Sequence, residues 1–136
     1  MTPAERMSGR MPNEHEIEEI ARATLARLPS PFAESLRDIV LLVEPVADKE
    51  TARSVGLSHP MQLSGLYHGV PLNHQSPSYP TILPERITLY SRPILAEWRS
   101  TRVSLAQLVA HIVIHEVGHH FGFSDDDMHA LEDSVE

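Results

Sequence analysis

Residues 115–125 read HEVGHHFGFSD, and the interpretation of the whole chain starts from this stretch. It contains His-Glu-x-x-His, a glycine three residues later at Gly122, and an aspartate three residues after that at Asp125. On an α-helix, side chains four positions apart lie on one face, about 40° apart around the axis. The imidazoles of His115 and His119 are therefore expected to converge on one metal ion, and this spacing is typical of zinc sites.

The residues around the two histidines predict the other parts of a catalytic metal site. Glu116 lies about 100° round the helix from the first histidine, which suits a general base acting on a metal-activated water. Gly122 can adopt the positive φ that ends a helix in a left-handed turn, and such a turn can bring Asp125 back as a third ligand. Asp126 and Asp127 are the alternatives for that position. Three protein ligands and a water form the open coordination typical of catalytic zinc.

Length and composition limit the class of protein. The 136 residues are 41% hydrophobic, which predicts one domain at 13–136 preceded by a flexible arm at 1–12. The chain has no cysteine, which excludes disulfides and thiolate zinc ligands. We expect a cytoplasmic protein with no membrane partner, because neither a secretory signal nor an apolar run of about eighteen residues is found.

The negative charge is concentrated at one end of the chain. Residues 125–136 carry six acidic side chains and no Lys or Arg, so −6 of the net charge of −8 lies there and −2 on the other 124 residues. Such a run is usually a solvated helix face. Because it adjoins the predicted metal site and repels phosphate groups, a nucleic-acid partner is not expected.

Hydrophobic periodicity and end signals predict the order of helices and strands. Helices are expected at 13–28, 32–36, 47–55, 93–99, 104–121 and 124–133. Strands are expected at 39–45, 63–70 and 86–90. The first strand, IVLLVEP, is an unbroken apolar run and is therefore expected to be buried on both faces. The proline-rich segment 71–85 is expected to be a loop.

Three blocks of sequence carry a family resemblance. They are LSGLYHGVPL at 63–72, PERITLYSRPIL at 84–95 and VIHEVGHHFGFSDDDM at 113–128. In these blocks the chain resembles the small bacterial zincin-like metallopeptidases, sometimes described as minimal zincins. The resemblance covers most of residues 14–133. It implies an α+β minimal zincin-like fold, in which a small mixed β-sheet packs against an active-site helix and flanking helices.

The resemblance also implies a zinc cofactor and roles for four residues. His115 and His119 would be ligands, Glu116 the catalytic carboxylate and Asp125 the third ligand, at the place where larger metzincins have a third histidine. Met128 stands too close to the motif to form the methionine turn of those larger enzymes. The function expected is a zinc-dependent peptidase acting on a peptide or protein, in which a metal-activated water attacks the peptide carbonyl and Glu116 takes the proton and returns it to the amine.

Two other functions share parts of this pattern. A zinc-binding interaction module without catalytic turnover could carry the same ligands. Metal-dependent endoribonucleases with His-x-x-x-His-x-x-Gly-x-x-His share the spacing but lack the glutamate. Glu116, the aspartate at the third ligand position and the acidic balance therefore favour a peptide over RNA.

The remaining histidines of the region are expected to have supporting roles. His111 lies one turn before the first ligand and is interpreted as structural, because a fourth protein ligand would close the metal site. His120 points away from the ligand face and is expected to pack or to support a ligand. Tyr67, His68 and His74 are candidates for polarising a substrate carbonyl, although core or loop roles are the more common use of such residues.

Overall fold

The computed structural model describes residues 11–30, 32–69 and 85–135, apart from the side chains of His120, Asp125, Ser134 and Val135. Nearly all of the predicted loop at 71–85 and of the predicted arm at 1–12 lies outside these residues. The helices described are α2 (Glu14–Ala26), α3 (Phe32–Ser35), α4 (Lys49–Ser54), the 3-10 helix η1 (Pro60–Gln62), α5 (Ser91–Ser100), α6 (Leu105–Phe121) and α7 (Asp125–Val135). The strands described are β1 (Val40–Glu44), β2 (Gly65–His68) and β3 (Arg86–Tyr90).

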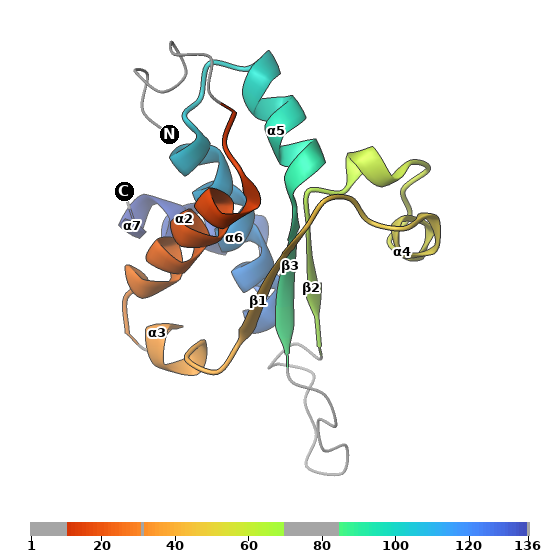
Figure 1. The fold of residues 1–136 in the computed structure, drawn as a ribbon. Coiled ribbons are helices and arrows are strands. Elements are labelled where there is room, and N and C mark those ends of the chain that lie inside the picture. Colours follow the sequence, from red (N-terminus) through yellow and green to blue (C-terminus); the bar gives the residue numbers. More distant parts are fainter. Residues whose placement is uncertain (1–10, 31, 70–84, 136) are drawn as a thin grey trace.

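The three strands form one mixed sheet in the order β1-β3-β2. β1 runs parallel to β3, and β2 runs antiparallel to it. Helices α2 and α6 lie against the sheet and contact each other, whereas α4 and η1 project beyond the β2 edge (Figure 1). This arrangement confirms the α+β minimal zincin-like fold, with a small mixed sheet packed against the helix that carries the His-Glu-x-x-His motif.

The prediction that the first strand is buried on both faces is wrong. On β1, Leu41 is buried, but the next residue, Leu42, is 38% exposed. The reason is topological, because among the described strands β1 lies at an edge and only β3 has a neighbour on both sides. β3 instead is the strand with a continuous buried stretch, and Ile87 and Leu89 are fully buried on it. An apolar run alone therefore did not distinguish an edge strand from a central one.

Helix α6 begins and ends at capping residues that can be recognised in its sequence. At the N-terminus, Ser104 Oγ accepts from the Gln107 amide at 3.1 Å, and Gln107 Oε1 accepts from the Ser104 amide at 3.2 Å. This reciprocal pair is a capping box. At the C-terminus, Gly122 has φ 71° and ψ 33°, and the Phe123 amide donates to the Gly118 carbonyl at 2.8 Å. The predicted left-handed turn at Gly122 is confirmed.

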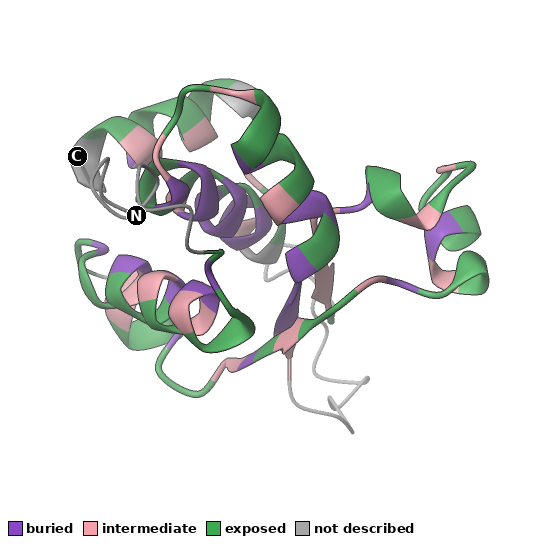
Figure 2. Ribbon diagram, turned by 45° about the horizontal axis from the view of Figure 1, so that its top comes forward, coloured by how far each residue is buried: buried purple, intermediate pink, exposed green. Residues whose placement is uncertain are grey.

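Between these ends α6 forms the centre of the hydrophobic core. Its buried positions face the sheet and α2, and they stand out along the helix in Figure 2. They include Leu105, Val109, Val113 and Val117, each with no exposed area. Within the residues that the structure describes, no helix is both long enough and apolar enough to cross a membrane.

A glycine inside the His-Glu-x-x-His motif allows α7 to pack closely on α6. A Cβ atom added to Gly118 would lie 2.6 Å from Cγ and 2.7 Å from Sδ of Met128, which is shorter than van der Waals contact permits. Met128 therefore occupies the space that a side chain at position 118 would need. This contact holds the start of α7, the segment that contains the predicted third ligand, against the motif.

We predict that Gly118→Ala destabilises the protein although alanine is the better helix former. The helix preference favours alanine by about 0.5–1 kcal/mol, but overpacking against Met128 costs about 1–3 kcal/mol. Urea unfolding should show a net loss of stability. In a Met128→Ala background, where the space is free, Gly118→Ala should become neutral or stabilising. An equal stabilisation by Gly118→Ala in both backgrounds would show that the two helices do not pack as described.

Candidate metal and catalytic site

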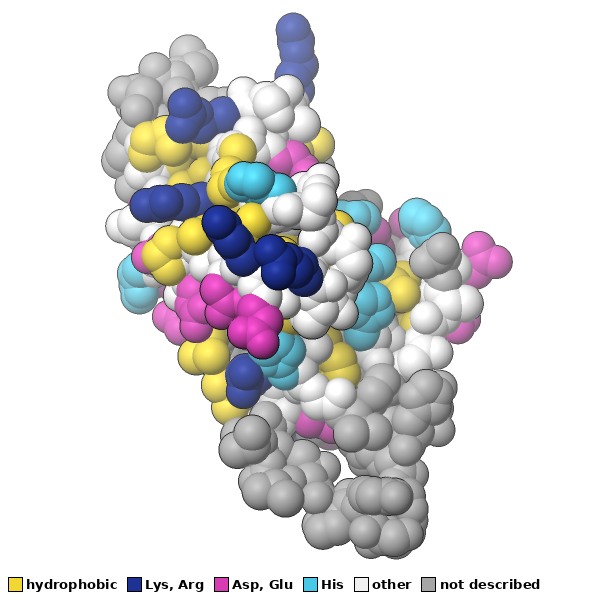
Figure 3. Space-filling model, turned by 90° about the vertical axis from the view of Figure 1, so that its right-hand side faces the viewer, with side chains coloured by type: hydrophobic (Ala, Val, Ile, Leu, Met, Phe, Trp, Pro, Cys, Tyr) yellow, Lys and Arg dark blue, Asp and Glu magenta, His cyan; other side chains and the backbone are white. Residues whose placement is uncertain are grey.

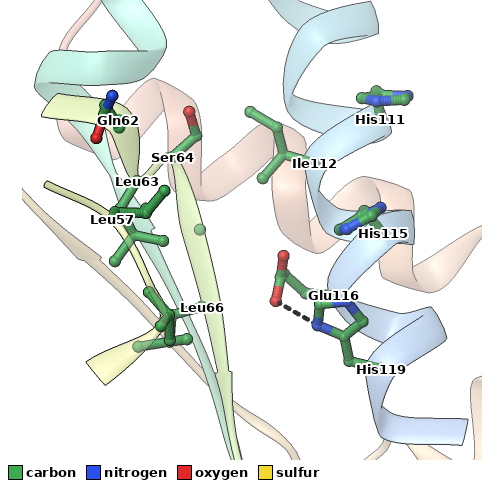
Figure 4. Close-up of a pocket in the computed structure, with 12 residues that line it drawn as sticks. Leu57, Gln62, Leu63, Ser64, Leu66, His111, Ile112, His115, Glu116 and His119 are labelled. Carbon is green, nitrogen blue, oxygen red and sulfur yellow. Dashed lines mark ion pairs between the residues drawn. The ribbon is translucent and has the colours of Figure 1, made fainter. Parts of the chain in front are cut away.

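His115 and His119 lie one helical turn apart on the face of α6 that is not buried in the core. Their ring centroids are 4.7 Å apart and the rings are inclined by 65°. Both residues are exposed, and the side chain of His119 is 46% exposed. The structure thus places the two imidazoles together at the surface, where both can be reached from solvent (Figure 4). Figure 3 shows a group of histidine side chains on this side of the molecule.

Glu116 differs from its histidine neighbours because it is only 5% exposed. Its side chain turns from α6 towards β2 (Figure 4). β2 can approach this closely because residue 65 is glycine. A Cβ atom there would lie 2.8 Å from Ile112 Cγ2 and 3.5 Å from Glu116 Cγ. The sheet therefore covers the side of Glu116 and leaves the carboxylate near the histidines.

The carboxylate of Glu116 lies close to His119, and the hydrogen-bonding capacity of its Oε1 atom is otherwise unused within the described residues. Oε1 lies 3.3 Å from Nδ1 of His119, an ion-pair contact, and makes no hydrogen bond within the described part of the chain. The neighbouring carboxylate raises the pKa of His119 above its ordinary value, and partial desolvation opposes the rise. A carboxylate beside Nδ1 favours the proton on that nitrogen, which leaves Nε2 free to bind a metal.

These features fit a zinc ion and the water that accompanies it. A buried carboxylate oxygen without a hydrogen bond is costly unless a proton donor or a cation is supplied to it. Two imidazoles with a free nitrogen each are preferred zinc ligands. The set of donors around Glu116 is therefore the kind that a catalytic zinc site uses.

The described side chains include two of the three predicted ligands, His115 and His119. Among them no group of three His, Cys, Asp or Glu residues is arranged to hold a metal. Asp125 begins α7 directly after the turn that follows α6, and its side chain lies outside the described part. Of the two alternatives, Asp127 is engaged as a helix cap, because its Oδ2 accepts from the Ser124 amide at 3.2 Å. Asp126 is exposed to solvent.

The other residues considered from the sequence lie in different places. Nδ1 of His111 is 2.9 Å from Oε1 of Glu132, so this pair joins α6 to α7, in keeping with a structural role. Tyr67 and His68 belong to β2 but do not line the pocket that contains Glu116. His74 and the side chain of His120 lie outside the described residues.

A pocket of about 380 Å³ opens between α6 and the β2 edge of the sheet. Its α6 wall contains Glu116, both candidate histidine ligands and Ile112. Its opposite wall is formed by the chain from Val55 to Leu66, which includes Leu57 and Gln62 (Figure 4). Sequence reasoning missed this wall. The available signal was a pair of apolar residues, Val55 and Leu57, on either side of a turn glycine in an otherwise polar segment.

Comparison with known proteins identifies a family for most of the chain. The profile of the zincin-like metallopeptidases matches residues 36–135, which is most of the chain. The protein therefore belongs to the zincin-like metallopeptidase family. A comparison with curated proteins gave no match.

We predict that the protein binds about one zinc ion and that Asp125→Ala weakens binding. Loss of a supporting partner alone lowers metal affinity by roughly 10–100-fold, and loss of a ligand should lower it at least as much. Competition with a zinc chelator measures the effect. Asp126→Ala, one residue away and exposed, is the matched control and should keep wild-type affinity. If Asp125→Ala retains full affinity and Asp126→Ala does not, the third ligand is Asp126.

Proposed function

We propose that this protein is a zinc-dependent peptidase, in which His115, His119 and Asp125 hold the metal and Glu116 is the general base. The observation that carries the proposal is the buried Glu116 carboxylate, whose Oε1 lies 3.3 Å from Nδ1 of His119, and the His119 ring in turn lies 4.7 Å from the ring of His115. Beyond this ion-pair contact Oε1 has no hydrogen bond within the described residues, whereas most buried polar side-chain atoms are hydrogen-bonded. The membership of the zincin-like metallopeptidase family supports the same function.

The chemistry divides between the metal and Glu116. A zinc ion supplies Lewis acidity, which acidifies a water molecule and stabilises negative charge on the carbonyl oxygen. Glu116 accepts a proton from the water as that water attacks the peptide carbon. It then donates the proton to the nitrogen of the leaving amine, so the carboxylate is regenerated at the end of each turnover.

Burial prepares Glu116 for this exchange of protons. The sheet shields its side chain at Gly65, while the carboxylate shares a pocket with the candidate ligands. The open side of the pocket leaves room for an extended peptide along the β2 edge.

The pocket also bears on the alternative functions. No Lys or Arg is among the described residues that line it, and Glu116 contributes a negative charge. Phosphate groups of RNA would find no positive partner there. We therefore favour a peptide or protein substrate. A zinc-binding interaction module would have the same ligands but would not hydrolyse peptides. An assay of peptide cleavage therefore distinguishes it from the peptidase.

We predict that Glu116→Gln keeps zinc and loses hydrolysis. The amide preserves the shape of the side chain but cannot accept the proton, and loss of a general base lowers the rate by about 10²–10⁴-fold. Cleavage of a mixed peptide library, followed by mass spectrometry alongside zinc content, measures both properties. Glu97→Gln, an exposed glutamate on α5, is the control and should cleave like wild type.

Three results would overturn the proposed function. Equal cleavage by wild type and Glu116→Gln would remove Glu116 from the mechanism. A zinc-loaded wild-type protein that cleaves no peptide in a broad library would identify the interaction module instead. Cleavage of RNA by the same preparation, absent in His115→Ala, would assign the protein to the nuclease class.

A further inference from the structure

The pocket beside Glu116 has a second, apolar half that the proposed chemistry does not use. Residues that line it away from the histidines include Val55, Leu57, Leu63, Leu66 and Ile112. Ile112 comes from α6, Leu66 from β2, and Leu57 and Leu63 from the chain before β2 (Figure 4). Val55 directly follows α4. Residues 55–66, which we call the pocket wall, therefore place an apolar surface opposite the catalytic face of α6.

We infer that this apolar half receives a large apolar side chain of the substrate, next to the bond that is cleaved, and that the pocket wall sets the preference. The inference rests on the proposed peptidase function. It adds the class of substrate, namely peptides with an aliphatic or aromatic residue adjacent to the cleavage site.

The pocket wall is held in place before any substrate binds. Ala47, Leu63 and Tyr90 are buried in a small cluster separate from the main core, and Leu57 and Leu66 pack against it. Leu57, Leu63 and Leu66 thus contribute both to this cluster and to the lining of the pocket. Their anchored positions reduce the ordering cost of binding, which favours a defined subsite over a mobile flap.

Turns and caps fix the path of the pocket wall between its apolar residues. Gly56 has φ 82°, a conformation that glycine adopts readily, and it separates Val55 from Leu57. At η1, His59 and Gln62 form a reciprocal capping box, in which Gln62 Oε1 accepts from the His59 amide at 3.1 Å. The polar groups of this segment are therefore largely satisfied locally, and its leucines are left to line the pocket.

The charges around the pocket favour an apolar side chain over an acidic one. An acidic side chain would be brought close to Glu116, and within the described lining no lysine or arginine could pair with it. Burial of an unpaired charge is unfavourable, whereas burial of a leucine or phenylalanine removes apolar surface from water. Differences of this kind change kcat/KM by about 10–100-fold.

The volume is suited to one large side chain. About 380 Å³ is available in the whole pocket, at the lower end of the range of ligand sites in proteins. Part of that volume adjoins the histidines and Glu116, where the peptide bond must lie. The apolar remainder is where we place the leucine or phenylalanine side chain.

Val55 offers a direct test because it is 43% exposed and can be changed without opening the core. In zinc-loaded protein, Val55→Arg should turn the preference from Leu or Phe towards Asp or Glu at the residue next to the cleaved bond. The arginine supplies the positive partner that the pocket lacks. We expect wild type to favour Leu or Phe over Asp or Glu by about 10–100-fold in kcat/KM. In Val55→Arg this preference for the apolar substrates should largely disappear.

Met61→Arg is the matched control. Met61 lies in the same pocket wall and is 39% exposed, but it does not line the pocket. The control variant should keep the wild-type preference, so a general effect of added positive charge is separated from an effect inside the pocket. Thermal unfolding of both variants verifies that each is folded.

A binding measurement separates this inference from the proposed function. Acetyl-leucinamide, acetyl-phenylalaninamide and acetyl-glutamic acid amide can be titrated into the protein while amide resonances are followed by NMR. We expect shifts at residues 55–66 for the two apolar probes only. Cleavage without apolar preference, or an unchanged preference in Val55→Arg, would overturn the inference and leave the peptidase standing. Apolar probes that bind at the pocket wall of a protein without peptidase activity would support the subsite and overturn the peptidase.

Discussion

The close approach of β2 to α6 is the contact on which the site depends. At Gly65 the strand has no side chain, so the sheet comes near enough to cover Glu116 and touch Ile112. This contact gives Glu116 an environment unlike that of the histidines beside it, although all three residues share two turns of one helix. The carboxylate becomes buried while the imidazoles stay exposed. The proposed roles of general base and metal ligands use this difference, because the ligands must reach an ion while the sheet shields the carboxylate beside them.

Helix α6 serves both the core and the site because its two faces have different sequences. Val109, Val113 and Val117 recur every four residues and are fully buried. His111, His115 and His119 recur with the same spacing on another face and are exposed. The core contacts hold the helix against the sheet and α2, and the histidines are positioned as a consequence. The Gly122 turn and the packing of Met128 on Gly118 then direct the chain into α7, so the segment with Asp125 stays near the motif.

Much of the fold could be predicted from the sequence, where local signals are strong. The capping box at Ser104, the helix that follows it and the turn at Gly122 were all expected and are present. Two features were not foreseen for physical reasons. The exposure of Leu42 depends on strand order, and an apolar run carries no information about which strand lies at an edge. η1 is three residues long, too short to show a helical period, and is specified by the cap between His59 and Gln62.

By itself, the sequence determined most helices and strands of this protein and the spacing of the residues in its candidate site. A periodicity of four brings His115 and His119 to one face of a helix, and this follows from helix geometry whatever the rest of the chain does. Only the tertiary structure decided the surroundings of those residues. The burial of Glu116 by β2 and the apolar pocket wall opposite it depend on contacts between segments some fifty residues apart in the chain, between residues 55–66 and α6. Such contacts are set by the packing of the whole domain, and no local pattern encodes them.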